Sequence, residues 1–223
     1  MRVWKIVAFT VVAGTALPIA LHHQRHGVFN GYEALLAFFL WLNTIIAFWE
    51  ICLFFSADLV AERHAEMTET FAGRAFARSI HFMSSTVHWR ALGSPASWTG
   101  VWTSYAGFDE SYANRSSYGF FVDVGNGFTT LIPSLLFLYG MTYAPFTART
   151  LGIVGLLAFY QMWYGTVVYL GSFFFNRRHV GHPLAHLAII VGLLNGLWLT
   201  FPLIGIYASI VMIYTNSYAL FLR

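Results

Sequence analysis

The stretch YEALLAFFLWLNTIIAFWEICLFF occupies residues 32–55 and is an almost unbroken run of apolar and aromatic side chains. About 20 such residues in a helix cross the roughly 30 Å hydrocarbon core of a bilayer. The stretch therefore predicts a transmembrane helix.

The composition of the whole chain agrees with this prediction. Of 223 residues, 58% are hydrophobic and only 9% are charged, against roughly 25% charged residues in soluble domains. So few charges cannot cover a water-soluble globule, which excludes that class of protein. The basic residues are spread thinly between apolar blocks, so we expect no nucleic-acid partner despite the net charge of +3. The single cysteine, Cys52, excludes an intramolecular disulfide.

Five segments are long and apolar enough to cross the membrane, and they predict an all-α bundle of five transmembrane helices. These segments are 3–21, 32–55, 117–140, 148–175 and 183–205. The first also has features of a secretory signal peptide, but we favour an uncleaved helix because four further spans follow it. Apolar residues continue past the fifth segment to Phe221, with Pro202 as an expected kink.

A polar connection, residues 56–116, separates the second and third spans. Acidic residues precede basic ones in its first half, as suits a helix dipole, so we expect an amphipathic helix on the membrane surface. Its aromatic second half, Trp89 to Tyr112, predicts an interfacial belt. The chain thus divides into residues 1–31, one span and its loop, and 32–223, a four-helix core with an insertion.

The orientation follows from the basic residues. Nine of the twelve fall on the side of the amino terminus and the connection, so we expect that side to be cytoplasmic. The expected location is the endoplasmic reticulum of a eukaryote or the inner membrane of a bacterium.

Ionisable side chains inside membrane helices are costly, which makes them functional candidates. Glu50 lies about 8 Å inside the end of the second span, and Asp123 lies about 9 Å inside the start of the third, on the same side. The two carboxylates share a depth, so we predict that they form a catalytic pair. The alternatives are a packing role for Glu50 and a solvated position for Asp123, if Gly125-Asn126-Gly127 breaks the helix.

Polar residues recur at helical spacing on the second to fifth spans, which predicts an internal pocket. The residues expected to bind substrate there are Asn43, Asn126, Tyr169, Asn195 and Trp198. His186 is within reach of the pocket rim, although on a regular helix it faces away from Asn195. Tyr169 and Asn195 are equally typical of hydrogen bonds between helices, and Trp198 of packing.

The carboxyl groups and the indole could act together in one acid–base reaction. A carboxyl group in low dielectric can stay protonated and act as an acid, while an ionised neighbour accepts a proton elsewhere. An indole face attracts a cation. Together they can shift a carbon-carbon double bond of a lipid, and this chemistry needs no metal or other cofactor.

The nine histidines suggest a competing interpretation, a metal-dependent lipid oxidase. The groups His22–His26 and His179–His186 resemble fragments of the boxes of membrane di-iron desaturases. The predicted topology places the two groups on opposite sides of the membrane, so we expect no metal site.

Several motifs resemble the emopamil-binding protein family, whose shared unit is the EXPERA domain. They are Tyr164-Gly-Thr-Val-Val-Tyr169, Gly181-His-Pro-Leu184, Asn195-Gly-Leu-Trp198 with Pro202, the aromatic-acidic segment Trp102 to Tyr112, and Glu50. The resemblance covers residues 36–205. It implies a five-helix bundle with a lipid pocket that also involves Tyr164.

The best-known members of that family are sterol isomerases, and relatives bind sterols or cationic amphiphiles without known turnover. The resemblance implies that Glu50 transfers protons, that Asp123 stands near a third-helix acid, and that Trp198 faces a cation. Ile46 and Ala47 stand where the isomerases carry a histidine. The first hypothesis is therefore a cofactor-independent isomerase or cyclase of a sterol or terpenoid lipid, and the second is a non-catalytic carrier of such a lipid. An oligomer is compatible with both.

Overall fold

The structure is a computed structural model that describes residues 1–71, 74–115 and 118–223. Its helices are α1 (Val3–His26), α2 (Gly31–Phe55), α3 (Ala57–Phe71), α4 (Ala75–Ser84), η1 (Trp89–Ala91), η2 (Pro95–Trp98), α5 (Thr99–Tyr105), α6 (Ser111–Asn114), α7 (Tyr118–Tyr143), α8 (Ala148–Phe175), α9 (Leu184–Leu187), η3 (Ala188–Leu193), α10 (Leu194–Thr215) and η4 (Ala219–Phe221). Residues 72–73 and 116 of the connection, and residue 117, where the third span is expected to begin, lie outside the described residues.

Within the described residues, five helical segments are long and apolar enough to cross a membrane. They are α1, α2, α7, α8 and the continuous stretch Leu184–Thr215, which α9, η3 and α10 form together. The described ranges contain no β-strand, only an isolated bridge between Arg2 and Thr86. The predicted all-α membrane bundle is therefore confirmed.

The last span continues past residue 205, in agreement with the apolar residues that follow the predicted segment. It runs through Pro202 to Thr215, and its 32 residues correspond to about 48 Å of helix. This length exceeds the roughly 30 Å hydrocarbon core, so the helix must tilt or extend beyond that core. Within it, η3 is a wider π-helical turn, and the Asn195 side chain donates a hydrogen bond back to the Val191 carbonyl over 2.8 Å.

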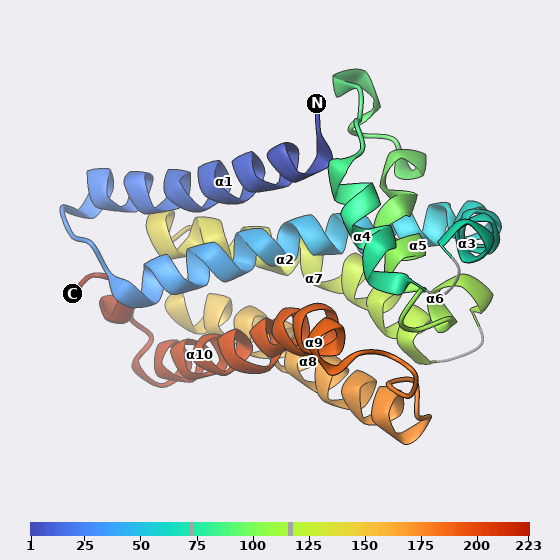
Figure 1. The fold of residues 1–223 in the computed structure, drawn as a ribbon. Helices are drawn as coiled ribbons and strands as arrows, with labels where there is room; N and C mark the ends of the chain where they lie inside the picture. The colour runs from blue at the N-terminus through green and yellow to red at the C-terminus, as the bar shows by residue number, and fades with distance from the viewer. Residues whose placement is uncertain (72–73, 116–117) are drawn as a thin grey trace.

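The long helices lie side by side, with α2 and α7 at the centre of the bundle (Figure 1). On one side α8 and α10 complete the core, where Phe137 and Phe159 meet edge to face with ring centroids 5.2 Å apart. At the other edge lies α1, whose Thr10 carbonyl accepts a hydrogen bond from Trp41 Nε1 over 2.7 Å. The core therefore sits among four helices, with α1 as a peripheral fifth.

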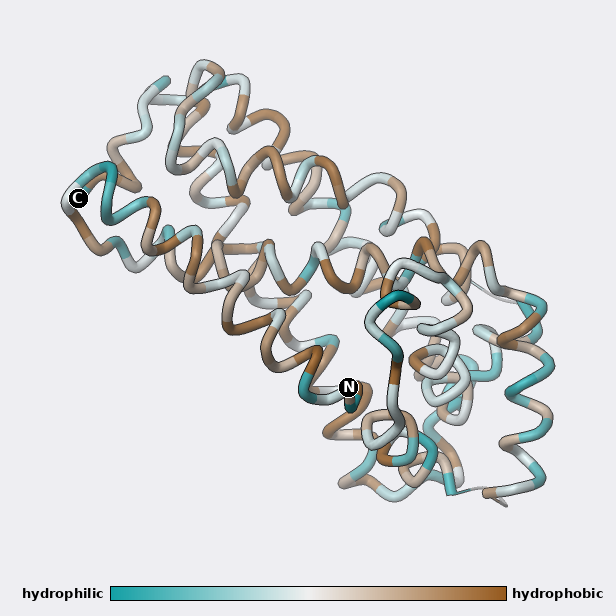
Figure 2. Tube along the Cα trace, turned by 90° about the horizontal axis from the view of Figure 1, so that it is seen from above, coloured by the Kyte–Doolittle hydropathy of each residue, from teal (hydrophilic) through white to brown (hydrophobic). Residues whose placement is uncertain are grey.

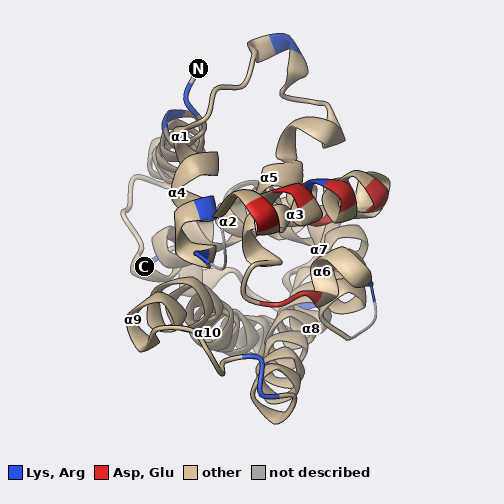
Figure 3. Ribbon diagram, turned by 45° about the vertical axis from the view of Figure 1, so that its right-hand side comes forward, with Lys and Arg blue, Asp and Glu red and all other residues tan. Residues whose placement is uncertain are grey.

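The elements α3 to α6, η1 and η2 form a polar cap at one end of the bundle (Figure 1). Hydrophilic residues are prominent in this cap, whereas the long helices are largely hydrophobic (Figure 2). Acidic residues gather along α3 (Figure 3). The expected single surface helix is thus divided into several short ones.

Contacts from distant parts of the chain fix the polar cap in place. The Met1 ammonium donates to the Val87 carbonyl over 2.8 Å, so the chain start lies at the capped end. The buried Asp109 forms an ion pair with Arg178, which follows α8. The cap is therefore attached to both the first span and the fourth.

Candidate functional site

The centre of the site is the crossing of α2 and α7. Gly127 lies at this crossing, because a Cβ atom there would fall 2.8 Å from Glu50 Cβ and 2.9 Å from the Ala47 carbonyl oxygen. Glycine lets the two backbones approach this closely. Asp123 precedes Gly127 by one helical turn, and its carboxylate lies close enough to Glu50 for the two to interact electrostatically. Since α7 is continuous through Gly125, the helix does not break next to Asp123.

Both carboxylates line one cavity of about 190 Å³ within the bundle. Its other walls come from α2, α5, α6, α7, α8 and α10, and they are mainly aromatic and aliphatic. The lining residues are Leu42, Ile46, Trp49, Glu50, Val101, Trp102, Tyr105, Tyr112, Asp123, Asn126, Thr166, Leu194, Asn195, Leu197 and Trp198. We call this space the carboxylate cavity.

The two carboxyl groups have different surroundings. Asp123 Oδ2 accepts a hydrogen bond from the Tyr112 hydroxyl over 2.7 Å. Glu50 is 5% exposed, and its Oε2 has no hydrogen-bond partner among the described residues. A negative charge is therefore better stabilised on Asp123 than on Glu50.

A network of hydroxyl and amide groups continues from Tyr112 along the wall of the cavity. The Tyr105 hydroxyl accepts hydrogen bonds from the Tyr169 hydroxyl and from Asn195 Nδ2, each over 3.1 Å. Burial raises the pKa of Tyr105 to about 12. Burial and, to a smaller degree, the charge of Asp123 raise the pKa of Tyr112 well above its usual range. Both phenols therefore stay neutral and available as hydrogen-bond donors near neutral pH.

The Trp198 indole is held against the cavity by a second network. Its Nε1 donates to Asn43 Oδ1 over 2.9 Å. The Asn43 amide in turn donates to the hydroxyls of Thr130 and Ser134, each over 3.1 Å. Asn43 is buried behind the indole and does not line the cavity, so it positions Trp198 instead of meeting a ligand.

The structure does not bring all the predicted binding residues together. Asn126, Asn195 and Trp198 line the cavity, whereas the buried Tyr169 lies behind Tyr105. Tyr164 is 49% exposed on the outer face of α8, where its ring stacks on Tyr160. His186 stacks on Phe76 of α4, with ring centroids 4.5 Å apart. Tyr164 and His186 therefore do not line the carboxylate cavity.

Part of the aromatic stretch expected as an interfacial belt instead closes the cavity. Trp102 and Tyr112 are only 5% and 1% exposed, and Trp102 Nε1 donates to the Trp49 carbonyl over 2.7 Å. Trp89, at 63% exposed, fits the expected interfacial position. The spacing of Trp98, Trp102 and Tyr105 places them on one helical face, which is the signal that could have indicated their burial against the bundle.

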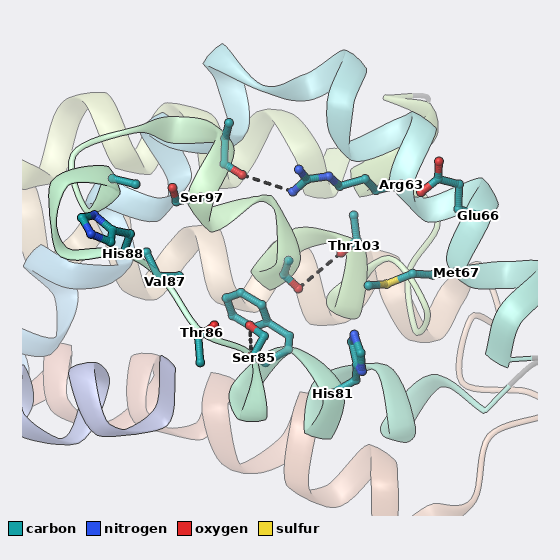
Figure 4. Close-up of a pocket in the computed structure, with 14 residues that line it drawn as sticks. Arg63, Glu66, Met67, His81, Ser85, Thr86, Val87, His88, Ser97 and Thr103 are labelled. Carbon is teal, nitrogen blue, oxygen red and sulfur yellow. Dashed lines mark hydrogen bonds between the residues drawn. The ribbon is translucent and has the colours of Figure 1, made fainter. Parts of the chain in front are cut away.

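A larger hollow of about 530 Å³ lies in the polar cap, between α3, α4 and α5 (Figure 4). Its main cation is already engaged, since Arg63 donates to the Ala96 carbonyl and to the Thr99 hydroxyl. The Ser85 hydroxyl likewise donates to the Phe82 carbonyl. This hollow contains neither buried carboxylate, so it is distinct from the candidate site.

The two histidine groups occupy opposite ends of the bundle (Figure 1). In the first, His22 Nε2 and His26 Nε2 contact the carbonyls of Phe221 and Thr142, each over 2.8 Å. In the second, the His182 ring packs on Phe108. Across the described ranges, no three His, Cys, Asp or Glu side chains are arranged to hold a metal ion.

Together these features define a multi-pass, all-helical membrane protein with a carboxylate-lined cavity inside its bundle. Comparison of the chain with protein-family models, with curated proteins and with solved structures found no match.

Proposed function

We propose that this protein is a membrane-embedded enzyme that shifts a carbon-carbon double bond in a sterol or terpenoid lipid by protonation and deprotonation. The observation that carries the proposal is that Glu50 and Asp123, from two different spans, line one cavity next to Trp198. Burying a carboxyl group inside a membrane helix is unfavourable in free energy, so two such groups lining one cavity indicate a functional role.

The hydrogen bonds support a different role for each carboxyl group. Glu50 is the general acid, because its Oε2 has no hydrogen-bond partner among the described residues to stabilise a negative charge. Asp123 is the general base, because Tyr112 donates a hydrogen bond to it. In the reaction Glu50 protonates the double bond, and Asp123 removes a different proton from the resulting carbocation.

Aromatic faces around the cavity stabilise the carbocation between these two steps. Trp49 and Trp198 both line the space that the acids share. An indole face within about 6 Å of a desolvated cation contributes about 2 kcal/mol. Transfer of a proton from Asp123 back to Glu50 then restores the starting state without an added reagent.

The resemblance to the emopamil-binding protein family supports the same proposal. Glu50 and Trp198 meet at one cavity as that resemblance implies, and Tyr105 joins Tyr169 to Asn195 beside it. We further propose that the capped end faces the cytoplasm, since most basic residues lie on that side. The membrane proposed for the protein is the endoplasmic reticulum or the bacterial inner membrane.

Hydrogen exchange into the lipid tests the function. The purified protein in lipid vesicles is incubated in heavy water with candidate sterols and polyprenols, and mass spectrometry measures deuterium in the lipid. Wild type should label a substrate, and Glu50→Gln and Asp123→Asn should each lower the rate by about 10²- to 10⁴-fold. Glu33→Gln is the matched control, because Glu33 is also a buried carboxyl on α2 but lies outside the cavity.

A second candidate function, an intramembrane lipid carrier, is favoured by one observation. Ile46 lines the cavity one turn before Glu50, and Ala47 lies beside it, where the resembling isomerases carry a histidine. Tight lipid binding by wild type with no deuterium uptake would establish the carrier and reject the enzyme.

A further inference from the structure

The carboxylate cavity is small for a lipid. Its volume of about 190 Å³ lies below the roughly 300–1,000 Å³ of sites that enclose a drug-sized ligand. A cavity below that range suits the five carbons of one isoprene unit better than the four fused rings of a sterol.

The walls of the cavity are tethered, which limits its expansion. Trp102 donates a hydrogen bond to the Trp49 carbonyl in the backbone of α2. Trp198 donates a hydrogen bond to Asn43, and the Tyr105 hydroxyl accepts two hydrogen bonds. Moving any of these rings outward would break a buried hydrogen bond, which is unfavourable.

One side of the cavity is aliphatic and reaches the surface of the bundle. Leu42 and Ile46 line it from α2, and Leu194 and Leu197 line it from α10. Leu194 is 45% exposed, so this side opens between two membrane spans. A ligand entering here keeps its remainder among the acyl chains of the bilayer.

From this size, rigidity and opening we infer that the substrate is a linear isoprenoid chain, whose unsaturated end enters the cavity between α2 and α10 while its tail stays in the bilayer. The inference rests on the proposed acid–base function and deepens it by naming the substrate class. A fused-ring sterol nucleus does not fit beside both carboxylates.

The reaction at the chain end is balanced without a co-reactant. The Glu50 proton adds to one carbon of the terminal double bond, whose π electrons form the new C–H bond and leave a tertiary cation on the other carbon. A neighbouring carbon then loses a proton to Asp123, and the electrons of that C–H bond form the new double bond. When the carboxyl protons of Glu50 and Asp123 exchange with heavy water between turnovers, deuterium enters the terminal unit even if the original alkene re-forms.

The test offers geranylgeraniol and a sterol with a ring double bond, separately, to the full-length protein in phosphatidylcholine vesicles made in heavy water. We expect deuterium in the terminal isoprene unit of geranylgeraniol, located by fragmentation, and none in the sterol. Leu194→Trp should abolish labelling by filling the opening, whereas Leu193→Trp, at a 62% exposed position outside the cavity, should leave it unchanged. Thermal unfolding of both variants verifies that they fold.

The outcomes separate the inference from the function on which it rests. Labelling of the sterol in place of the chain, or of both equally, would overturn the chain-end inference and leave the acid–base function standing. Labelling of neither lipid would overturn both. Equal labelling by the two tryptophan variants would reject entry between α2 and α10.

Discussion

Replacement of Gly127 by alanine should disrupt the helix crossing that brings the two carboxylates together. The added methyl group would lie 2.8 Å from Glu50 Cβ, 2.9 Å from the Ala47 carbonyl oxygen and 3.0 Å from the Ile51 nitrogen. Two of these atoms belong to the backbone of α2 and cannot rotate away, so the two helices must separate. Overpacking of this kind costs about 1–3 kcal/mol, which for a chain of this size lowers the melting temperature by roughly 2–12 °C.

The assay is thermal unfolding in detergent micelles, with deuterium uptake measured on the same samples. Gly125→Ala is the matched control, since it lies on the same helix and its added Cβ would meet no atom of the described residues within 4 Å. We expect Gly127→Ala to lose both stability and labelling, and Gly125→Ala to keep both. If the two variants melt at the same temperature, α2 and α7 do not cross as closely as described, and the reason given for the proximity of Glu50 and Asp123 fails.

Two further predictions concern ionisable side chains that lie outside the cavity. Glu33 is fully buried, and neither of its carboxyl oxygens has a hydrogen-bond partner among the described residues. Glu33→Leu should therefore raise the free energy of unfolding by about 1–2 kcal/mol, measured against Glu33→Gln. A loss of stability in Glu33→Leu would contradict this prediction. Burial and then the charge of Arg78 lower the pKa of His64 from 6.5. Because the unfolded chain then binds a proton that the folded chain does not, stability should fall as the pH drops below about 6.5, by at most about 1.4 kcal/mol per pH unit for this group. Chemical unfolding at several pH values should show a shallower dependence in His64→Gln, and an unchanged dependence would exclude His64 as its source.

The spans and the shared depth of the two acids follow from the sequence because both depend only on helix geometry. Runs of apolar residues set the spans, and the fixed rise per residue places Glu50 and Asp123 at one level. The same geometry explains why Tyr164 lies outside the cavity. It is two residues from Thr166, which lines the cavity from α8, and this is about 200° around the helix, so the two face nearly opposite sides. The motif resemblance grouped them without regard to that angle.

The closure of the cavity by the polar cap, in contrast, could not be predicted from the sequence. An apolar helical face packs equally well against lipid headgroups or against protein, so the spacing of Trp102 and Tyr105 does not tell which surface it meets. The choice depends on long-range contacts such as the Asp109–Arg178 pair, which joins residues far apart in the chain. Tyr112, the partner of Asp123, was predicted as part of the interfacial belt for the same reason.

The aliphatic opening at Leu194 also determines how affinity must be measured. A molecule that enters from between two spans is sampled at its mole fraction in the membrane, and its concentration in the buffer has little bearing on occupancy. Apparent affinities should consequently weaken as inert lipid is added at constant ligand, the behaviour known as surface dilution. Values obtained in micelles and in vesicles become comparable only after both are expressed per unit of amphiphile.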